Sequence, residues 1–173
     1  MITKEDIIKA QKEWSEGIIK MGQVSNNRAL LESFVSDFLD DVYYFQEKVL
    51  FKPTKAKIEQ FRNNKESAVS YFIAGDDKKC KEDNGFALSN WSKITFENSD
   101  IIINENQGLA MGNYTFENNE SKIKVEYSFG YIKINESIKI TLHHSSIPYQ
   151  NWIYLGLYQE QWTGEPGEQI IHQ

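Results

Sequence analysis

Hydrophobic residues recur at helical spacing through the first third of the chain. Thr3 and Asp6 form a capping-box pattern, and the apolar positions that follow it share one helical face. The inward positions of this first helix are Ile7, Gln11, Trp14 and Ile18. Asn27 is placed to cap a second helix. Its inward positions are Leu30, Leu31, Phe34, Val35 and Phe38. Further helical stretches are expected after Thr54, which would carry Ile58 and Phe61, and through "SAVSYFIAG".

The pattern changes to strands between residues 86 and 146. Four runs with strand character are separated by turns rich in Asn, Glu and Ser, as in an antiparallel meander. The run "KIKVEYSFGYIKI" alternates cleanly, and this predicts a strand with one buried face. That face comprises Ile123, Val125, Tyr127, Phe129 and Tyr131. Helices followed by a curved antiparallel sheet predict an α+β domain over residues 1–149, with an aromatic extension over 150–173.

Composition and charge exclude several classes of function. The chain has 173 residues, a net charge of −6 and scattered lysines, so it lacks the basic stripe of a nucleic-acid-binding protein. No apolar run reaches membrane-spanning length, and "MITKEDIIKA" lacks the hydrophobic region of a signal peptide. The single cysteine, Cys80, fits a reducing compartment, so we expect a cytoplasmic protein. Cys80 is expected to be an exposed thiol, and Glu82 and Asp83 are expected to solvate a polar loop.

The stretch "ITLHHSSIPY" carries two of the three histidines, His143 and His144. Neighbouring side chains on a strand point to opposite faces. The apolar run to Leu142 predicts that His144 and Ser146 continue the inner face, with His143 and Ser145 on the other. The two histidines would then not share a metal, and a zinc site built on His and Cys is not favoured. An inward His144 fits either a general base in a pocket or a buried, structurally satisfied imidazole.

Other catalytic signatures are missing from the sequence. It contains neither a glycine-rich phosphate loop nor a GxSxG nucleophile elbow. Residue chemistry alone therefore leaves the function undecided.

A family resemblance adds to this reading. In order along the chain, "VLFKPTKA", "AVSYFIAG", "EDNGFA", "MGNYTF", "VEYSFGYI" and "ITLHHSSIPY" resemble the association-domain family of calcium/calmodulin-dependent protein kinase II. Within that group they are most similar to the iota-class carbonic anhydrases of bacteria and algae. The resemblance runs from about Thr3 to Tyr149 and implies a nuclear-transport-factor-2-like cone. It also implies reversible hydration of carbon dioxide to bicarbonate, without a cofactor in several members, although manganese has been linked to others and zinc is not favoured.

The resemblance also implies a set of site residues. Thr54, Tyr71 and Ser146 would bind the substrate, and His144 would act beside them. From the residues alone, Thr54 fits a helix cap equally well, and Tyr71 fits a core aromatic. The secondary candidates are His143, Ser145 and Tyr127.

Two other functions stay open at this stage. Association domains form homodimers and larger homo-oligomers, so the chain could be a non-catalytic assembly or ligand-binding domain. Related SnoaL-like cones are pocket enzymes that act on greasy substrates, usually through an Asp or Glu base. No such acid is expected on the inner face of the last two strands, so a small polar ligand is favoured.

Overall fold

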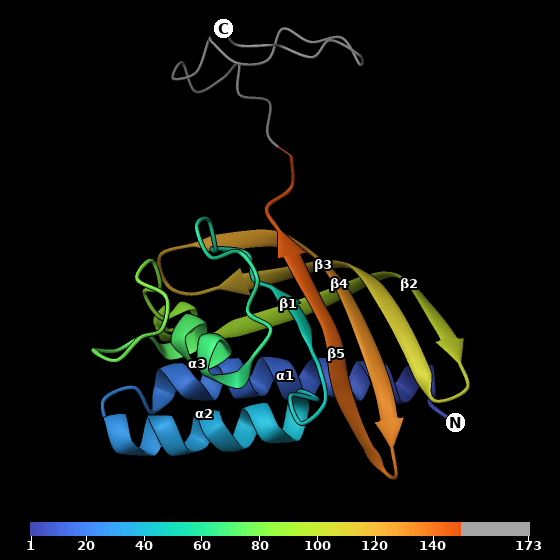
Figure 1. The fold of residues 1–173 in the computed structure, drawn as a ribbon. Helices are drawn as coiled ribbons and strands as arrows, with labels where there is room; N and C mark the ends of the chain where they lie inside the picture. The colour runs from blue at the N-terminus through green and yellow to red at the C-terminus, as the bar shows by residue number, and fades with distance from the viewer. Residues whose placement is uncertain (150–173) are drawn as a thin grey trace, which may run out of the picture.

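The computed structural model describes residues 1–149, which form helices packed into a curved sheet (Figure 1). The chain begins with α1 (Lys4–Gln23) and α2 (Arg28–Val42), followed by β1 (Leu50–Lys52) and α3 (Lys65–Ile73). A short 3₁₀ helix, η1 (Phe86–Leu88), leads into four long strands. These are β2 (Lys93–Asn104), β3 (Gln107–Glu117), β4 (Lys122–Ile134) and β5 (Ser137–Ser146). The α+β prediction is confirmed, and the extension predicted over residues 150–173 lies outside the described residues.

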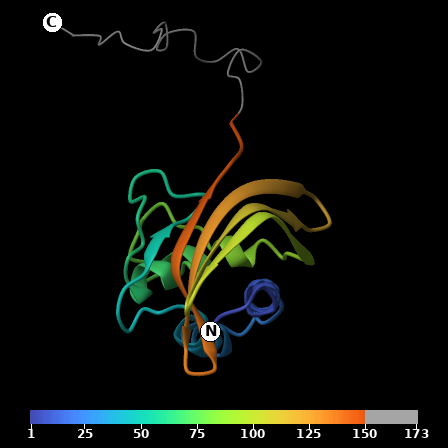
Figure 2. The same ribbon diagram turned by 90° about the vertical axis from the view of Figure 1, so that its right-hand side faces the viewer.

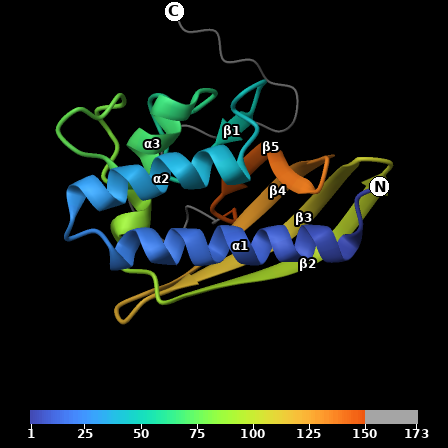
Figure 3. The same cartoon turned by 90° about the horizontal axis from the view of Figure 1, so that it is seen from below.

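The sheet has the order β1-β5-β4-β3-β2. Its four long strands form an antiparallel meander, whereas β1 pairs in parallel with the end of β5. The sheet arches over α1, which is seen end-on beneath it in Figure 2. Viewed from below, α1 and α2 lie side by side across the mouth of the arch (Figure 3). The concave face of the sheet and the two helices therefore enclose the core.

Local signals place the first two helices correctly. Thr3 and Asp6 form the reciprocal capping box of α1, and Asn27 accepts a hydrogen bond from the backbone N–H of Leu30 at the start of α2. Trp14 is buried in the middle of the core, where its ring makes edge contacts with Phe129 and several other aromatic rings. Leu30, predicted to point inward, is instead exposed on α2.

The predicted helix after Thr54 does not form. Residues 53–63 follow an irregular path, and both Ile58 and Phe61 are exposed. Glu82 accepts hydrogen bonds from the backbone N–H groups of this segment, which are then not available to a helix. A tertiary contact has therefore overridden a local helical pattern.

The loop that contains Cys80 and Asp83 is also more buried than its polar sequence indicates. Cys80 and Asp83 are buried, and both contact the buried guanidinium of Arg62. The predictions of an exposed thiol and of a solvated Asp83 are therefore wrong. The cause is Arg62, because a buried cation draws anionic and polar partners inward with it. Within residues 1–149 no helix is both long and apolar enough to span a bilayer.

Candidate active site

The end of β5 presents His143 and Ser145 to the interior, not His144 and Ser146. His143 and Ser145 are each only 2% exposed, whereas His144 is exposed to solvent. Ser146 donates a hydrogen bond of 3.0 Å to the Glu126 carboxylate on the outer face of the sheet. The predicted inward orientation of His144 and Ser146 is therefore wrong.

A β-bulge explains the reversal. Gly130 on β4 pairs with Leu142, but the next residue, Tyr131, pairs with Ile140, so Thr141 is an extra residue on β5. One extra residue shifts the alternation of every side chain beyond it. Ile140 points into the core before the bulge, and His143 points into the core after it.

Thr54 lies against Ser145 because β1 runs parallel to β5. The pairing places Phe51 beside His143, so the segment that leaves β1 passes the end of β5. The Thr54 hydroxyl donates a hydrogen bond of 2.9 Å to the Ser145 hydroxyl. Lys52 donates to the Ser145 backbone carbonyl at 3.2 Å, and its partial burial lowers its pKa. The sequence thus identified Thr54 as a site candidate, but paired it with the wrong serine of the doublet.

Tyr71 reaches the same place from α3. Its ring is buried between Phe51 and Phe86, and its hydroxyl accepts a 3.4 Å hydrogen bond from the backbone N–H of Lys55. Burial raises the pKa of Tyr71 well above its ordinary value, so the hydroxyl keeps its proton. Tyr71 is therefore a core aromatic whose hydroxyl lies at the edge of the cluster, next to the residue that follows Thr54.

Tyr114 on β3 also belongs to this group of side chains, and the sequence did not single it out. Its hydroxyl lies 3.4 Å from Nε2 of His143. Burial raises the pKa of Tyr114, and hydrogen bonds with Ser145 and Thr54 offset part of that rise. The signal was present, because Tyr114 lies within "MGNYTF". We call Thr54, Tyr71, Tyr114, His143 and Ser145 the hydroxyl cluster.

The protons of the cluster are oriented from behind by a chain of buried hydrogen bonds. The indole N–H of Trp14 donates to the Tyr43 hydroxyl at 2.8 Å, and that hydroxyl lies 2.8 Å from Nδ1 of His143. An indole only donates, so the Tyr43 oxygen is an acceptor there. The direction of the bond to Nδ1 depends on the His143 tautomer. We assign the Tyr43 proton to Nδ1, because this direction gives that buried proton a partner. The neutral His143 ring then carries its proton on Nε2 and donates to Tyr114. The Tyr114 proton is left to donate to Ser145, Thr54 or a bound ligand.

The environment of His143 makes this residue a poor general base. Burial, and secondarily the neighbouring charge of His144, hold the pKa of His143 well below 6.5. Its ring is packed against Phe51 and Phe129, with ring centres 4.7 Å and 4.1 Å away. His143 is therefore a fixed, neutral hydrogen-bond donor at neutral pH.

Tyr127, a secondary candidate, belongs to a different network. It faces inward as predicted, and its hydroxyl donates to Asn98 at 2.7 Å and accepts from Gln11 at 3.4 Å. Burial raises the pKa of Tyr127 to about 12. Its contacts with the hydroxyl cluster are made by its ring, which lies 5.3 Å from that of Tyr114.

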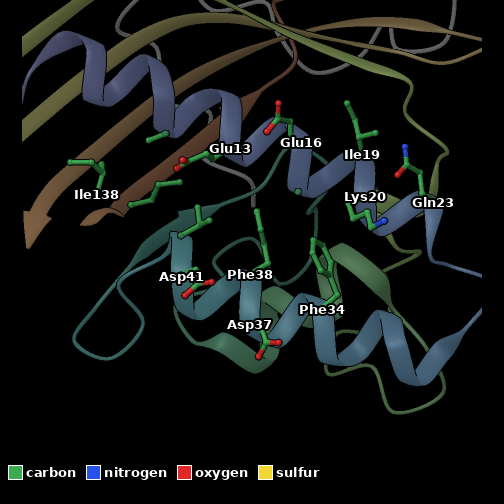
Figure 4. Close-up of a pocket in the computed structure, with 14 residues that line it drawn as sticks. Glu13, Glu16, Ile19, Lys20, Gln23, Phe34, Asp37, Phe38, Asp41 and Ile138 are labelled. Carbon is green, nitrogen blue, oxygen red and sulfur yellow. The ribbon is translucent and has the colours of Figure 1, made fainter. Parts of the chain in front are cut away.

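One surface hollow adjoins the segment that carries Thr54, and a second lies away from the hydroxyl cluster. One of about 410 Å³ is lined by Lys55, Trp91 and Asn118 and adjoins the Thr54 segment. The other, of about 760 Å³, lies between α1 and α2 and contains no member of the hydroxyl cluster (Figure 4). The smaller hollow is the better-placed approach, since Lys55 directly follows Thr54. In the part of the chain that the structure describes, no group of three or more His, Cys, Asp or Glu side chains is placed to hold a metal ion.

Comparison with known proteins identifies the family. A family model described as metal-independent carbonic anhydrase matches residues 5–147. The chain belongs to this family. A metal-independent carbonic anhydrase of Nostoc sp. (strain PCC 7120) is 35% identical over 155 residues, which are 86% of this chain and 75% of that protein.

Solved structures agree with this membership. The iota-carbonic anhydrase of a cyanobacterium, crystallised with bicarbonate, superposes with a TM-score of 0.82 and is 33% identical. The match covers 87% of this chain and 94% of that one. An NTF-2-like protein of Shewanella oneidensis has a TM-score of 0.51 at 16% identity, covers 84% and 99% of the two chains, and shows the fold alone. The family resemblance and the nuclear-transport-factor-2-like fold expected from the sequence are therefore confirmed.

Proposed function

We propose that the chain catalyses the reversible hydration of carbon dioxide to bicarbonate at the hydroxyl cluster, without a metal. Membership of the metal-independent carbonic anhydrases over residues 5–147 carries the proposal. The part-buried hydrogen bond between Thr54 and Ser145, with the buried Tyr114 beside it, supports the location. In this proposal, the roles that the sequence predicts for His144 and Ser146 are assigned to His143 and Ser145, because these are the members of the doublets that face the interior.

The proposed mechanism follows from two properties of the cluster: it has no effective base at neutral pH, and it holds several hydroxyl groups. The nearby tyrosines have raised pKa values and His143 has a lowered one, so none of them is an effective base at neutral pH. Hydroxyl groups, however, accept one proton while donating another. In the proposed step, the oxygen of a water forms a bond to the carbon of carbon dioxide, and one C=O electron pair moves onto oxygen. The Thr54 and Ser145 hydroxyls relay the water's proton to that oxygen.

The product of this relay is carbonic acid, which ionises to bicarbonate and a proton in solvent. Tyr114 and Tyr71 would donate hydrogen bonds to the oxygen that gains charge. Tyr114 is oriented for this role because His143 already donates to its oxygen. A preorganised donor of this kind contributes about 10²- to 10³-fold in rate when it is shielded from water.

The direct test is stopped-flow hydration of carbon dioxide by the full 173-residue chain, before and after prolonged chelation. We expect activity to survive chelation. It should fall about 100-fold in Ser145→Ala and Tyr71→Phe, and it should be retained in the matched control Ser146→Ala. Loss of activity to chelator would instead indicate a metal-dependent reaction. A protein that binds bicarbonate but shows no hydration would indicate a ligand-binding domain.

We also propose that the chain forms a homodimer or higher homo-oligomer through the outer face of β2 and β3. Ile102, Leu109 and Met111 are 63%, 52% and 61% exposed there, and Ile102 is the cross-strand partner of Leu109. Apolar side chains gathered on one sheet face commonly mark an interface. Light scattering on the wild type and on Met111→Lys would test this, with a monomeric wild type as the contrary result. A cytoplasmic location is a further proposal, supported by the single cysteine and testable with a tagged chain.

A further inference from the structure

The segment that carries Thr54 is held in place by one carboxylate. Both oxygens of Glu82 accept backbone N–H groups from three successive residues, Lys57 at 2.8 Å, Ile58 at 3.0 and 3.1 Å, and Glu59 at 2.8 Å. Successive N–H groups that converge on one anion form a nest. These bonds lower the pKa of Glu82 and keep it ionised. They are a main constraint on a segment that has no helix or strand of its own.

The next residue, Asp83, holds the helix that carries Tyr71. One of its oxygens accepts a 2.8 Å hydrogen bond from the Arg62 guanidinium, and the other accepts a 2.6 Å bond from the Ser70 hydroxyl. The side chains of Arg62 and Asp83 have no exposed surface. Ser70 directly precedes Tyr71 on α3, so Asp83 restrains the position of that helix turn.

Arg62 links the contacts of Glu82 and Asp83 to β1. It ends the same segment that begins beside Thr54, and its backbone N–H donates to the carbonyl of Phe51 on β1 at 2.7 Å. Its guanidinium also contacts Glu82 at 3.5 Å. One acidic pair, Glu82 and Asp83, thus connects the Thr54 segment, the end of β1 and the Tyr71 helix. Removing either member of a buried ion pair leaves an uncompensated charge, so the connection depends on both.

We propose that Glu82, Asp83 and Arg62 are positioning residues that set the spacing between the Thr54 and Tyr71 hydroxyls. This inference rests on the proposed function. The side chains of these three residues form no hydrogen bond or ion pair with the described members of the hydroxyl cluster. They act through the backbone of residues 57–59 and through Ser70. A displacement of about 1 Å in a reacting group lowers rates by up to about 100-fold. These positions should therefore control turnover as well as stability.

Graded variants separate positioning from simple support. Glu82→Gln keeps an oxygen that accepts the backbone N–H groups, whereas Glu82→Ala removes every acceptor. Asp83→Asn neutralises the partner of Arg62. The matched control is Asp40→Asn, because Asp40 forms a 2.7 Å ion pair with Lys65, the first residue of α3, but does not contact the Thr54 segment.

The chain carries its own reporter for this region. Cys80 is its single cysteine, is buried, and contacts the Arg62 guanidinium and the Glu59 carboxylate. A buried thiol reacts slowly with a disulfide reagent until its surroundings open. The rate of thiol modification therefore measures the integrity of the Arg62–Asp83 pair without reference to activity.

The experiment measures kcat and KM for carbon dioxide hydration, together with thiol reactivity, well below the unfolding midpoint of each variant. We expect kcat to fall about 10- to 100-fold in Glu82→Ala and Asp83→Asn, to be largely restored in Glu82→Gln, and to be unchanged in Asp40→Asn. Thiol reactivity should rise in Asp83→Asn. Glu82 is half-buried, so its variants test the inference even if Asp83→Asn does not fold.

The outcomes separate this inference from the proposed function. An active wild type whose kcat is unaffected in Glu82→Ala would overturn the positioning role alone, as would an equal loss in Asp40→Asn. A wild type without hydration activity would overturn the proposed function and this role together.

Discussion

Replacing Tyr43 with Phe removes one oxygen from the middle of the chain of hydrogen bonds behind the active site. The indole N–H of Trp14 and Nδ1 of His143 would both lose their partner inside the core, since each lies 2.8 Å from that oxygen. A buried polar group without a partner costs about 1–3 kcal/mol, so two of them should lower the free energy of unfolding by about 2–6 kcal/mol. For a chain of this length, 3 kcal/mol corresponds to a fall of about 6–12 °C in the unfolding midpoint.

The same change should affect catalysis through the histidine tautomer. Without the Tyr43 proton, His143 gains little from keeping its own proton on Nε2, and Tyr114 is then free to donate to the ring instead of to a ligand. A preference of about 1 kcal/mol for one hydrogen bond corresponds to roughly a fivefold change in population, which should appear as a similar fall in kcat.

Thermal unfolding and ¹⁵N NMR of the imidazole nitrogens measure the two effects separately. Tyr44→Phe is the matched control, because the neighbouring hydroxyl has no hydrogen-bond partner among residues 1–149. A wild-type spectrum with the His143 proton on Nδ1 would refute the assignment of proton directions. An unfolding midpoint for Tyr43→Phe that matches Tyr44→Phe would refute the stability estimate.

Three further predictions follow from burial and charge. His143→Gln should lose at least tenfold in kcat/KM, as expected for a lost preorganised donor. His144→Gln, on the exposed side, should stay within about twofold of wild type. A larger loss in His144→Gln than in His143→Gln would contradict the bulge. The rate of carbon dioxide hydration should be flat between about pH 6.5 and 9, because the pKa of His143 is lowered and those of the cluster tyrosines are raised out of this range; an inflection near pH 6.5–7 in stopped-flow rates would show that a base does titrate. The pKa of Asp6 is lowered, chiefly by its hydrogen bond to Lys133, so its contribution to stability is present above its unfolded pKa and is lost as pH falls through the folded value. Urea unfolding between about pH 5 and pH 3 should therefore depend less on pH in Asp6→Asn than in the wild type.

Most of the fold could be predicted from the sequence because its signals are local. Thr3 and Asn27 cap their helices through residues only three positions away. In β4, the buried face from Val125 to Tyr131 follows from alternation alone, since the bulge beside it leaves the extra residue on β5. These elements needed no knowledge of the rest of the chain.

The inner face of β5 could not be predicted in this way. Thr141 is not a residue type that marks a bulge, and the doubled "HHSS" offers one histidine and one serine to either face. The residue types at this point therefore fit either register of β5 equally well. In the register that forms, the His143 ring packs against Phe51 and Phe129, which come from two other strands, so the selecting contacts are not local in sequence.

The prediction of a helix after Thr54 is wrong for a related reason. Its helical pattern is real, but its backbone donors are taken by Glu82, a residue more than twenty positions away. The same distant contacts bury Asp83 and Cys80 in a stretch whose composition is typical of an exposed loop. Sequence periodicity does not register such contacts, because they depend on which loops the fold brings together.

The parallel pairing of β1 with β5 has a consequence for the order of folding. Thr54 and Ser145 are 91 residues apart in sequence, and β1 reaches the sheet only through its pairing with the end of β5. Closing so long a stretch of chain is entropically expensive and slow compared with helix formation. After dilution from denaturant, helical circular dichroism should therefore return first, and hydration activity should return only with the slowest kinetic phase. The protein would pass through a state that is structured, compact and inactive before Thr54 and Ser145 come together.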